Sequence, residues 1–409
     1  MATFNKKISI IKKEQLHKLI ILLPYLWLVT GLFLYKDSDK GMVIMMMISV
    51  IASISHKGLK VVKENITNSK MLWIIFIITA YALFSYYYHG LSSREIRAFV
   101  ALSIFLPFFP RALFTKDLLI ILTIVGSVSC FSSAIYYSII EEVNRAHWPI
   151  NAIPFSTIAA TFSLLAIGLL TAKKSNFQKT LLILALLLTI VSVLISQTRG
   201  VWVAFTITAI ILIFLTVKEN KINFNYKILL TSFILFSIIA VASYPKIEKR
   251  LMQTQSEVKK ISAGNLGSSI GLRLQMLAVT PDMVKGDLWI GTGNGQSDKL
   301  AMLYKQGKVR ESLYRSHPPH YHNQYADKLI KNGLIGLILF LLLLLIPILE
   351  SKHVSMANRH TIIGIVLLFS LAAMTDAPFN HGQSLFVFVL LLFALTNKEN
   401  SSTKAQTIK

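Results

Sequence analysis

Long apolar runs separated by short polar segments dominate the chain. The segment LLILALLLTIVSVLI at residues 181–195 and the segment GLIGLILFLLLLLIPIL at residues 333–349 contain no charged residue. Runs of this kind fit the roughly 17 to 25 residues with which a helix crosses the bilayer core. The hydrophobic pattern therefore predicts an all-α, polytopic membrane protein.

The apolar runs predict twelve transmembrane helices. They cover residues 19–35, 42–55, 71–88, 98–113, 118–140, 155–171, 180–196, 201–217, 228–244, 333–349, 361–376 and 384–396. The second and the last are short. The prediction divides the chain into nine helices within residues 1–244, a long polar loop at 245–332, three helices within 333–396 and a tail at 397–409.

The distribution of Lys and Arg predicts the orientation in the membrane. With both termini in the cytoplasm, the cytoplasmic segments carry 22 Lys and Arg and the short outside loops carry 6. The long loop is left out of this comparison, because long segments cross the membrane regardless of charge. The bias predicts cytoplasmic termini and places the loop 245–332 on the periplasmic side.

Composition narrows the class of protein further. Hydrophobic residues make up 54% of the chain and charged residues 15%, so the formal net charge of +23 is better explained by cations beside membrane helices than by nucleic-acid binding. No small-residue cleavage site follows the first apolar run, which predicts an uncleaved first helix. Cys130 is the single cysteine, so no intrachain disulfide is possible.

The first part of the long loop has the pattern of a basic amphipathic helix. Ile247, Leu251, Thr254, Val258 and Ile261 fall on one helical face, and Lys246, Lys249, Arg250, Lys259 and Lys260 fall on others. Such a helix is predicted to lie along the lipid headgroups. The alternative is a solvated helix packed on the rest of the loop.

Two further segments of the loop suggest local structure. Ser268 or Ser269 is expected to cap a helix that runs to about Val284 and places Arg273 near its first turn, a good position for an anion unless the arginine is simply solvated. GTGNG at residues 291–295 lacks the spacing of either nucleotide-binding glycine loop, so it predicts a tight turn.

Three histidines, His317, His320 and His322, follow within six positions. Metal binding is one interpretation, but no cysteine or HExxH motif accompanies them, so no metal site is predicted. His317 and His320 are interpreted as loop residues. His322 opens a predicted helix, where the positive end of the dipole disfavours the protonated imidazole and keeps it able to accept a proton.

Three motifs in this part of the chain resemble the O-antigen ligase and polymerase family, over roughly residues 155–345. They are SQTRGVW at 196–202, the RLQM…WIGTGNG segment at 273–295, and His322-Asn323 followed by the membrane entry Gly333-Leu334-Ile335-Gly336. Two positions depart from the family pattern. Asn332 stands where many relatives carry Glu, and Ala326 replaces the usual Leu.

The resemblance implies a transmembrane glycosyltransferase with a periplasmic helical cap. Its donor would be a glycan on undecaprenyl pyrophosphate, and its acceptor a sugar hydroxyl of lipid A–core for a ligase. No cofactor or metal is implied, and the membrane would be the inner membrane of a Gram-negative bacterium. Direct displacement at the anomeric carbon predicts inversion, because no paired nucleophilic carboxylate lies near His322 in the sequence.

The resemblance and the predicted sidedness together suggest a set of site residues. His322 is the expected general base, and Arg199 and Arg273 are expected to bind the donor pyrophosphate. Asp376 is expected to orient His322 or an arginine, with a solvated helix cap as the alternative. Further candidates on the same side are listed here as supporting residues: Asn323, Arg145, Arg94 and Arg97.

Other functions remain open at this stage. An O-antigen polymerase or a related lipid-linked glycan transferase would share the donor and the motifs. A twelve-helix transporter or a membrane scaffold is more distant, since the long loop does not divide the chain into two similar halves of six helices. The ligase is favoured because the loop 245–332 holds 14 basic and 7 acidic residues, and lipid A–core is anionic.

Overall fold

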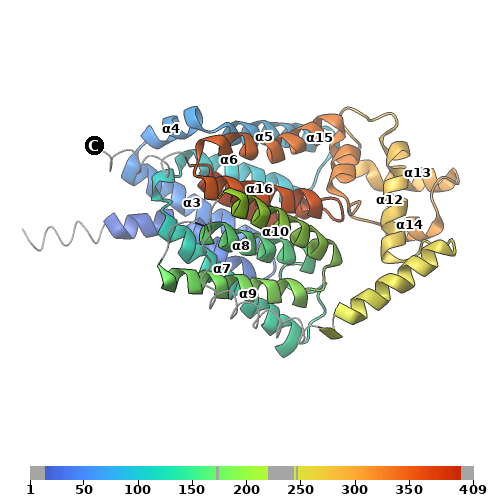
Figure 1. Cartoon of the computed structure of the whole chain (residues 1–409). Coiled ribbons are helices and arrows are strands. Elements are labelled where there is room, and N and C mark those ends of the chain that lie inside the picture. Colours follow the sequence, from blue (N-terminus) through green and yellow to red (C-terminus); the bar gives the residue numbers. More distant parts are fainter. Residues whose placement is uncertain (1–13, 172–174, 220–243, 246, 398–409) are drawn as a thin grey trace, which may run out of the picture.

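The computed structural model describes residues 14–171, 175–219, 244–245 and 247–397. All regular secondary structure within these ranges is helical, which confirms the predicted all-α membrane fold. The helices that form the membrane bundle are α2 (Leu23–Val29), α3 (Ser38–Lys57), α5 (Lys70–His89), α6 (Ser93–Phe108), α7 (Lys116–Ile135), α8 (Ala152–Leu170), α9 (Asn176–Ile195), α10 (Arg199–Glu219), α15 (Gln324–Glu350), α16 (Met356–Ala372) and α17 (Gly382–Leu395). They lie roughly side by side in Figure 1.

Hydropathy located most of these helices within a few residues. Seven described helices are long and apolar enough to cross a membrane, and α16 and α17 are shorter apolar helices. The predicted helix at 228–244 falls almost entirely outside the described residues, so the total of twelve stays a prediction. The helix predicted at 42–55 is longer in the structure, where α3 spans 20 residues.

Three predicted helices have different limits in the structure. The first, at 19–35, is broken into a helix over 14–21, α2 and a 3₁₀ turn over Gly31–Phe33; Pro24 lies at the start of α2 and cannot donate to the helix ladder. α6 ends at Phe108, next to Pro107, rather than at residue 113. α16 ends at Ala372, so Asp376 lies in the segment beyond the helix.

Small residues allow close packing inside the bundle. A Cβ atom added at Gly168 would meet the Thr361 hydroxyl at 1.7 Å, and one added at Gly200 would meet the Thr375 hydroxyl at 2.2 Å. Such close approach is how helices associate in lipid, where apolar surfaces gain little from leaving the solvent. Gly200 therefore brings the start of α10 directly against the segment that follows α16.

Residues 247–332 form a helical cap on one end of the bundle (Figure 1). The cap contains a helix over 247–262, α12 (Ser269–Val284), α13 (Gln296–Lys305), α14 (Glu311–Ser316) and the first residues of α15. The cap has its own small hydrophobic core, formed by Met276, Val279, Met283, Leu300, Leu303, Val309, Leu313, Tyr321 and Ile330. The predicted cap of α12 is confirmed, since the Ser268 hydroxyl accepts from the Gly271 N–H.

A break at Gly333 separates the cap part of α15 from its membrane part. Gly333 has φ of 65°, and its missing Cβ would lie 2.3 Å from the carbonyl of Trp289. The Leu334 N–H donates to the Leu288 carbonyl at 2.8 Å. The turn predicted at 291–295 is confirmed, because Gly293–Gly295 form a 3₁₀ turn beside this break. Glycine is required at position 333, because a residue with a side chain would have a strained backbone and would clash with the neighbouring main chain.

Candidate active site

His322 lies in the loop between α14 and α15, where the cap meets the bundle. It has φ of 44° and precedes Asn323, the N-cap of α15. His322 is therefore outside the first helical turn, which differs from the sequence prediction. Asn323 occupies the cap because its side chain accepts from the Ala326 N–H at 3.0 Å and donates to the Met374 carbonyl at 3.1 Å. The contacts of Asn323 therefore hold the neighbouring His322 against the end of α16.

Asp376 is the direct partner of His322. Its Oδ1 atom lies 2.9 Å from His322 Nδ1 and 3.1 Å from His320 Nε2. The carboxylate is buried. Burial raises the pKa of Asp376, but the hydrogen bonds and positive charge of His320 and His322 more than offset this and hold it well below its usual range. Asp376 is therefore an ionised carboxylate at neutral pH.

This arrangement selects the proton positions on His322. An ionised carboxylate only accepts hydrogen bonds, so His322 Nδ1 must carry the proton that it shares with Asp376. In the neutral imidazole, the other ring nitrogen, Nε2, is then the hydrogen-bond acceptor. A carboxylate that orients an imidazole in this way leaves it ready to act as a general base.

His320 belongs to the same cluster, although the sequence placed it among the loop residues. Its ring centroid lies 4.4 Å from that of His322, and both imidazoles meet Asp376. The error arose because the partner lies 56 positions away in the chain. His317 fits the loop interpretation better, since it is exposed and its ring lies near Tyr314 rather than Asp376.

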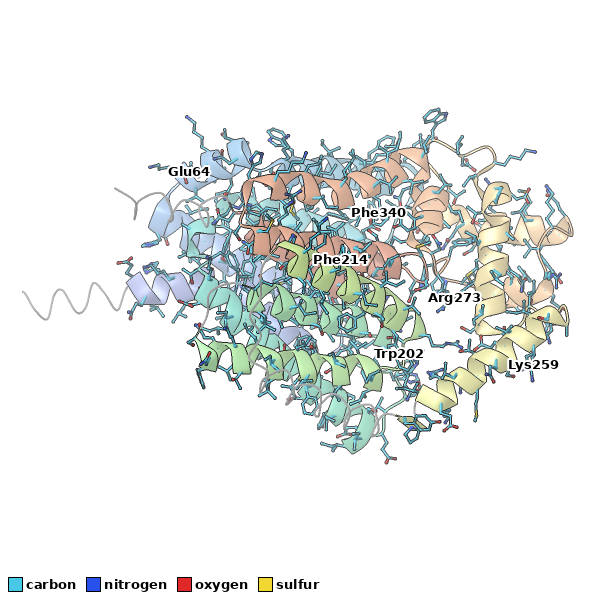
Figure 2. All side chains as sticks on the ribbon, viewed as in Figure 1. Glu64, Trp202, Phe214, Lys259, Arg273 and Phe340 are labelled. Carbon is cyan, nitrogen blue, oxygen red and sulfur yellow. The ribbon has the colours of Figure 1, made fainter. Side chains whose placement is uncertain are left out.

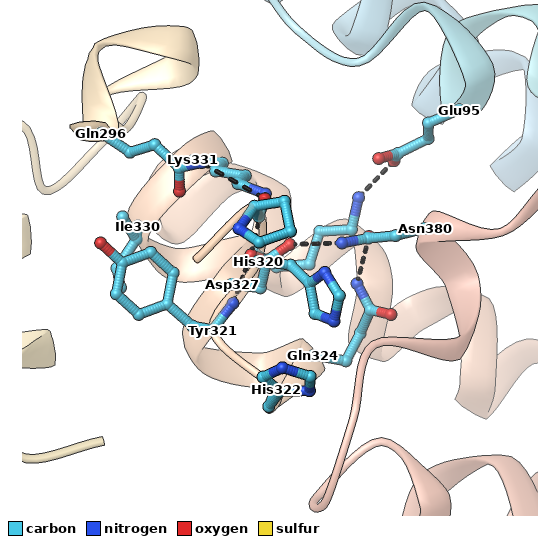
Figure 3. A network of polar contacts seen from close by, with 12 residues as sticks. Glu95, Gln296, His320, Tyr321, His322, Gln324, Asp327, Ile330, Lys331 and Asn380 are labelled. Atoms are coloured by element: carbon cyan, nitrogen blue, oxygen red, sulfur yellow. Dashed lines mark hydrogen bonds and ion pairs between the residues drawn. The ribbon is translucent and has the colours of Figure 1, made fainter. Parts of the chain in front are cut away.

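A buried polar network holds this loop in place (Figure 3). Asp327 accepts from the Tyr321 N–H at 3.1 Å, from the Asn380 side chain at 2.8 Å, and pairs with Lys331 at 3.0 Å. The Gln324 side chain donates to Asn380 at 2.9 Å. Because these residues come from both the cap and the segment before α17, the network fixes His320 and His322 relative to the bundle.

An arginine pocket adjoins Asp376 on the same end of the bundle. Its lining includes Arg145, Arg199, Arg273, Thr375 and Asp376. Burial, and then the charges of Arg250, Arg199 and Arg273, lower the pKa of Arg145 to about 10. A pocket in which cations repel one another in this way favours an anion, which would relieve the repulsion.

The three arginines of the pocket differ in their present partners. Arg145 donates to the carbonyls of Ser196 and Gln197, at 3.1 and 2.6 Å. Arg199 donates to Thr254 at 2.8 Å and to Glu257 at 2.9 Å, so it ties α10 to the helix over 247–262.

Arg273, half-buried on α12, forms no hydrogen bond or ion pair with any residue that the structure describes. Its side chain lies between α12 and the bundle in Figure 2. It is the arginine of this pocket whose guanidinium is uncommitted. A guanidinium in this position can bind phosphate oxygens through two parallel N–H donors.

The helix over 247–262 differs in part from its prediction. It is helical as expected, but two of its polar side chains turn toward the bundle. Arg250 donates to Gln197 at 3.1 Å, and Glu257 pairs with Arg199 while accepting from the Ile270 N–H at 3.0 Å. Its location in the headgroups stays a prediction. Arg250 was missed as a site residue because a basic face at this position also suits a lipid surface.

Arg94 and Arg97 lie apart from the arginine pocket. Arg94 pairs with Asp37 and Arg97 with Asp39, each at 3.6 Å. The charge of Arg94 also acts on His381, the N-cap residue of α17, whose pKa is lowered to about 4, chiefly by burial. The structure therefore does not bring these two arginines to His322, whereas Arg145, Arg199, Arg273 and Asp376 lie together.

One side-chain cluster has the composition of a metal site. His320, His322 and Asp376 offer ligand atoms that all lie within 4.8 Å of one another. The absence of ligand partners in the sequence was one reason for predicting no metal, and Asp376 supplies such a partner. The same atoms are also within hydrogen-bonding distance of each other, so the geometry suits a hydrogen-bonded catalytic group as well as a cation.

Comparison with known proteins identifies the central part of the chain. Residues 183–341 match the family model described as O-antigen ligase. This confirms the resemblance that the three motifs suggested. The matched segment contains Arg199, Arg273 and His322, whereas Arg145 and Asp376 lie outside it.

A relative from Haemophilus influenzae, described as an uncharacterized protein, is 28% identical to this chain over 248 residues. The match covers 57% of this chain and 61% of that protein, so the chain spans less than two thirds of the length of its relative.

Proposed function

We propose that this O-antigen-ligase-like membrane protein transfers a glycan from undecaprenyl pyrophosphate to a sugar hydroxyl of lipid A–core, at the periplasmic face of the inner membrane. The observation that carries the proposal is the position of Asp376. This carboxylate contacts His322 on one side and lines the arginine pocket on the other. This position supports a base and an anion site that lie next to each other, the arrangement that glycosyl transfer from a pyrophosphate requires.

His322 acts as the general base. Its Nε2 atom removes the proton from the acceptor hydroxyl while the hydroxyl oxygen forms a bond to the anomeric carbon of the donor. The bond between that carbon and the phosphate oxygen breaks, and the lipid pyrophosphate leaves with the electron pair. Attack opposite the leaving group inverts the anomeric carbon. Asp376 holds the Nδ1 proton and stabilises the imidazolium that forms.

Arg273 and Arg199 bind the leaving pyrophosphate. Arg273 forms no hydrogen bond or ion pair with the described residues, and Arg199 exchanges its contacts with Thr254 and Glu257 for phosphate oxygens. Arg145 adds positive charge from the bundle side. Donors aimed at charge that grows during the reaction stabilise the transition state more than the ground state.

The charge of the cap favours lipid A–core as the acceptor. The segment 245–332 carries seven more basic than acidic residues, which suits an anionic, phosphorylated acceptor at the membrane surface. Strains that lack the protein test this choice. We expect unsubstituted core to accumulate while polymerised glycan remains on its lipid carrier.

If the protein is a polymerase instead, a strain that lacks it should carry single repeat units in place of the long glycan. Purified protein supplied with lipid-linked glycan and lipid A–core provides the direct test. Formation of the joined product is expected, and its absence with active, folded protein would contradict the proposal.

A further inference from the structure

The cap has a second concave surface on the far side of the histidine loop. This cap groove is lined by Gln296, Ser297, Asp298, Tyr314, His317 and Tyr321, and has a cavity volume of about 210 Å³. That volume corresponds to about seven water molecules at ~30 Å³ each, which is suited to one sugar residue. In Figure 3 the Tyr321 ring points away from the imidazoles of His320 and His322, toward the side of Gln296.

The charge of the cap groove disfavours an anion, and its mixed polar and apolar lining disfavours a long lipid tail. Asp298 contributes an exposed carboxylate, and neither Lys nor Arg lines the groove. The arginine pocket has the opposite character, since three guanidinium groups line it. The remaining lining combines hydroxyl, amide, imidazole and phenol groups with the apolar side chains of Leu300, Ala301 and Pro318. A long apolar chain would leave the polar groups unpaired.

The lining instead suits a neutral polyol with one apolar face. A sugar ring offers hydroxyl groups to Asp and Gln side chains and C–H groups to an aromatic face. Tyr314 is such an aromatic wall, and it is held rigid because it stacks on Tyr304 with a centroid distance of 4.3 Å and an angle of 3°. Few, well-positioned polar groups beside an aromatic surface are typical of small-ligand sites.

One polar atom of the groove has no explanation within the described part of the chain. The Gln296 Nε2 group donates to the Pro319 carbonyl at 3.3 Å, but the buried Oε1 atom of the same amide has no hydrogen-bond partner among the described residues. His317 has φ of 40° because it is the left-handed C-cap residue of α14, so its backbone follows from the helix end and not from a ligand. A buried polar atom without a partner needs an explanation, and a hydrogen bond from a bound ligand is one.

We propose that the cap groove binds a neutral sugar residue of the glycan, beyond the end that reacts at His322. This inference rests on the proposed glycan transfer and adds a subsite to it. The two sites share the loop 317–323, so a glycan held in the groove is positioned by the same segment that carries the base. The sugar belongs to the glycan of either the lipid-linked donor or the acceptor, and the experiment separates these sources.

The binding test needs no transfer activity. Glycan released by mild acid from the lipid-linked intermediates of the source cells is added to the purified full-length protein, and binding is followed by saturation-transfer NMR. Asp298→Asn and Tyr314→Leu should each weaken binding about tenfold, the effect of about one lost hydrogen bond or stacking contact. Asp282→Asn is the matched control, because Asp282 lies on α12, pairs with Lys308 and does not line the groove.

Unchanged affinity in Asp298→Asn would overturn the subsite, and Asp298 is exposed, so this isosteric change should leave the fold intact. Transfer by the wild-type protein without measurable binding of free glycan would also overturn it, while the proposed function would stand. Groove-dependent binding in a protein that transfers nothing would support the subsite and contradict the proposed function.

Steady-state assays then identify the source of the sugar. An increase in KM for the long-glycan donor alone, with kcat retained in Asp298→Asn, assigns the groove to the donor. An increase confined to KM for the acceptor assigns it to the acceptor.

Discussion

The membrane bundle and the cap are stabilised in different ways, and the candidate active site lies where they meet. The bundle has an extended apolar core in which α17 is buried along its whole length. Its helices approach closely through glycines such as Gly168 and Gly200. The cap has nine buried core residues and many polar contacts, and its small core depends on the hydrophobic effect in water.

Each region supplies part of the site. The bundle provides Arg199 from the start of α10, and Arg145 and Asp376 from the segments that join its helices. The cap provides His322 and Arg273 from a loop and a helix that are held to the bundle by hydrogen bonds. Neither region contains both His322, the proposed base, and Asp376, the carboxylate that it contacts. The comparison shows that catalysis should depend on the docked cap, and that cap and bundle residues can be tested separately.

The largest effect is expected from the cap residue His322. His322→Ala should lower transfer by about 10²–10⁴-fold, because a positioned base contributes that much to the rate. Binding of the lipid-linked donor should persist, since the arginine pocket is unchanged. Transfer is measured in membranes at matched protein levels. His317→Ala is the control: with donor and acceptor both saturating it should remain active, because His317 does not contact Asp376. A fully active His322→Ala would exclude this residue as the base.

Asp376 tests the bundle side of the same contact. Asp376→Asn removes the charge that orients the imidazole, which costs about 1.5–3 kcal/mol for a charge-assisted hydrogen bond. That corresponds to about ten- to hundredfold in kcat, with little change in donor KM. His320→Ala keeps the contact between Asp376 and His322 and should lose much less. Equal activity of Asp376→Asn and wild type would remove this carboxylate from the mechanism.

The arginine pocket allows the direct comparison of a cap residue with a bundle residue. Arg273→Ala and Arg199→Ala should each slow transfer by about ten- to hundredfold if one charge-assisted contact is lost in the transition state. Lys should restore only part of the rate at either position, because it lacks the planar fork.

Arg199→Ala should also lower the melting temperature, since Arg199 pairs with Glu257 between bundle and cap, whereas Arg273→Ala should not. Normal transfer by both alanine variants would refute the pyrophosphate assignment.

Stability against pH provides a smaller test of the segment that joins α16 to α17. Burial lowers the pKa of His381 to about 4, below the ordinary value of 6.5. Between these values the unfolded chain binds more protons than the folded one, so the free energy of unfolding should fall as the pH drops from about 6.5 toward 4.

His381→Gln should show a weaker dependence of melting temperature on pH over this range. A variant and a wild type with identical slopes would show that His381 is not held neutral by the fold.

The smallest effect is expected on metal removal. Transfer by purified protein should survive EDTA and gain nothing from added divalent ions, if His320, His322 and Asp376 act as a hydrogen-bonded group. Loss on chelation with recovery by zinc would instead identify this cluster as a metal site. A His320→Ala protein assayed in parallel would then bind the ion less tightly.

The sequence alone was sufficient to predict most of the fold. Helices in lipid require long apolar runs, and their flanking Lys and Arg follow a simple rule, so hydropathy located α5, α7, α8, α9 and α10 within a few residues. The N-cap of α12 and the turn at 291–295 were also predicted correctly, because serine caps and glycine turns depend on only a few neighbouring residues. Breaks such as those at Pro24 and Gly333 shifted helix limits without changing the fold class.

The sequence also suggested individual site residues from their chemistry, since arginine can bind phosphate and histidine can transfer protons. Their partners were decided by the tertiary structure. His322 and Asp376 are 54 positions apart, and Arg199 and Glu257 are 58 apart. Only the docking of α15 on the end of α16 brings Asp376 between His320, His322 and the arginine pocket. Such pairs form only when helices pack against each other, so they cannot be predicted from the order of hydrophobic and polar residues along the chain.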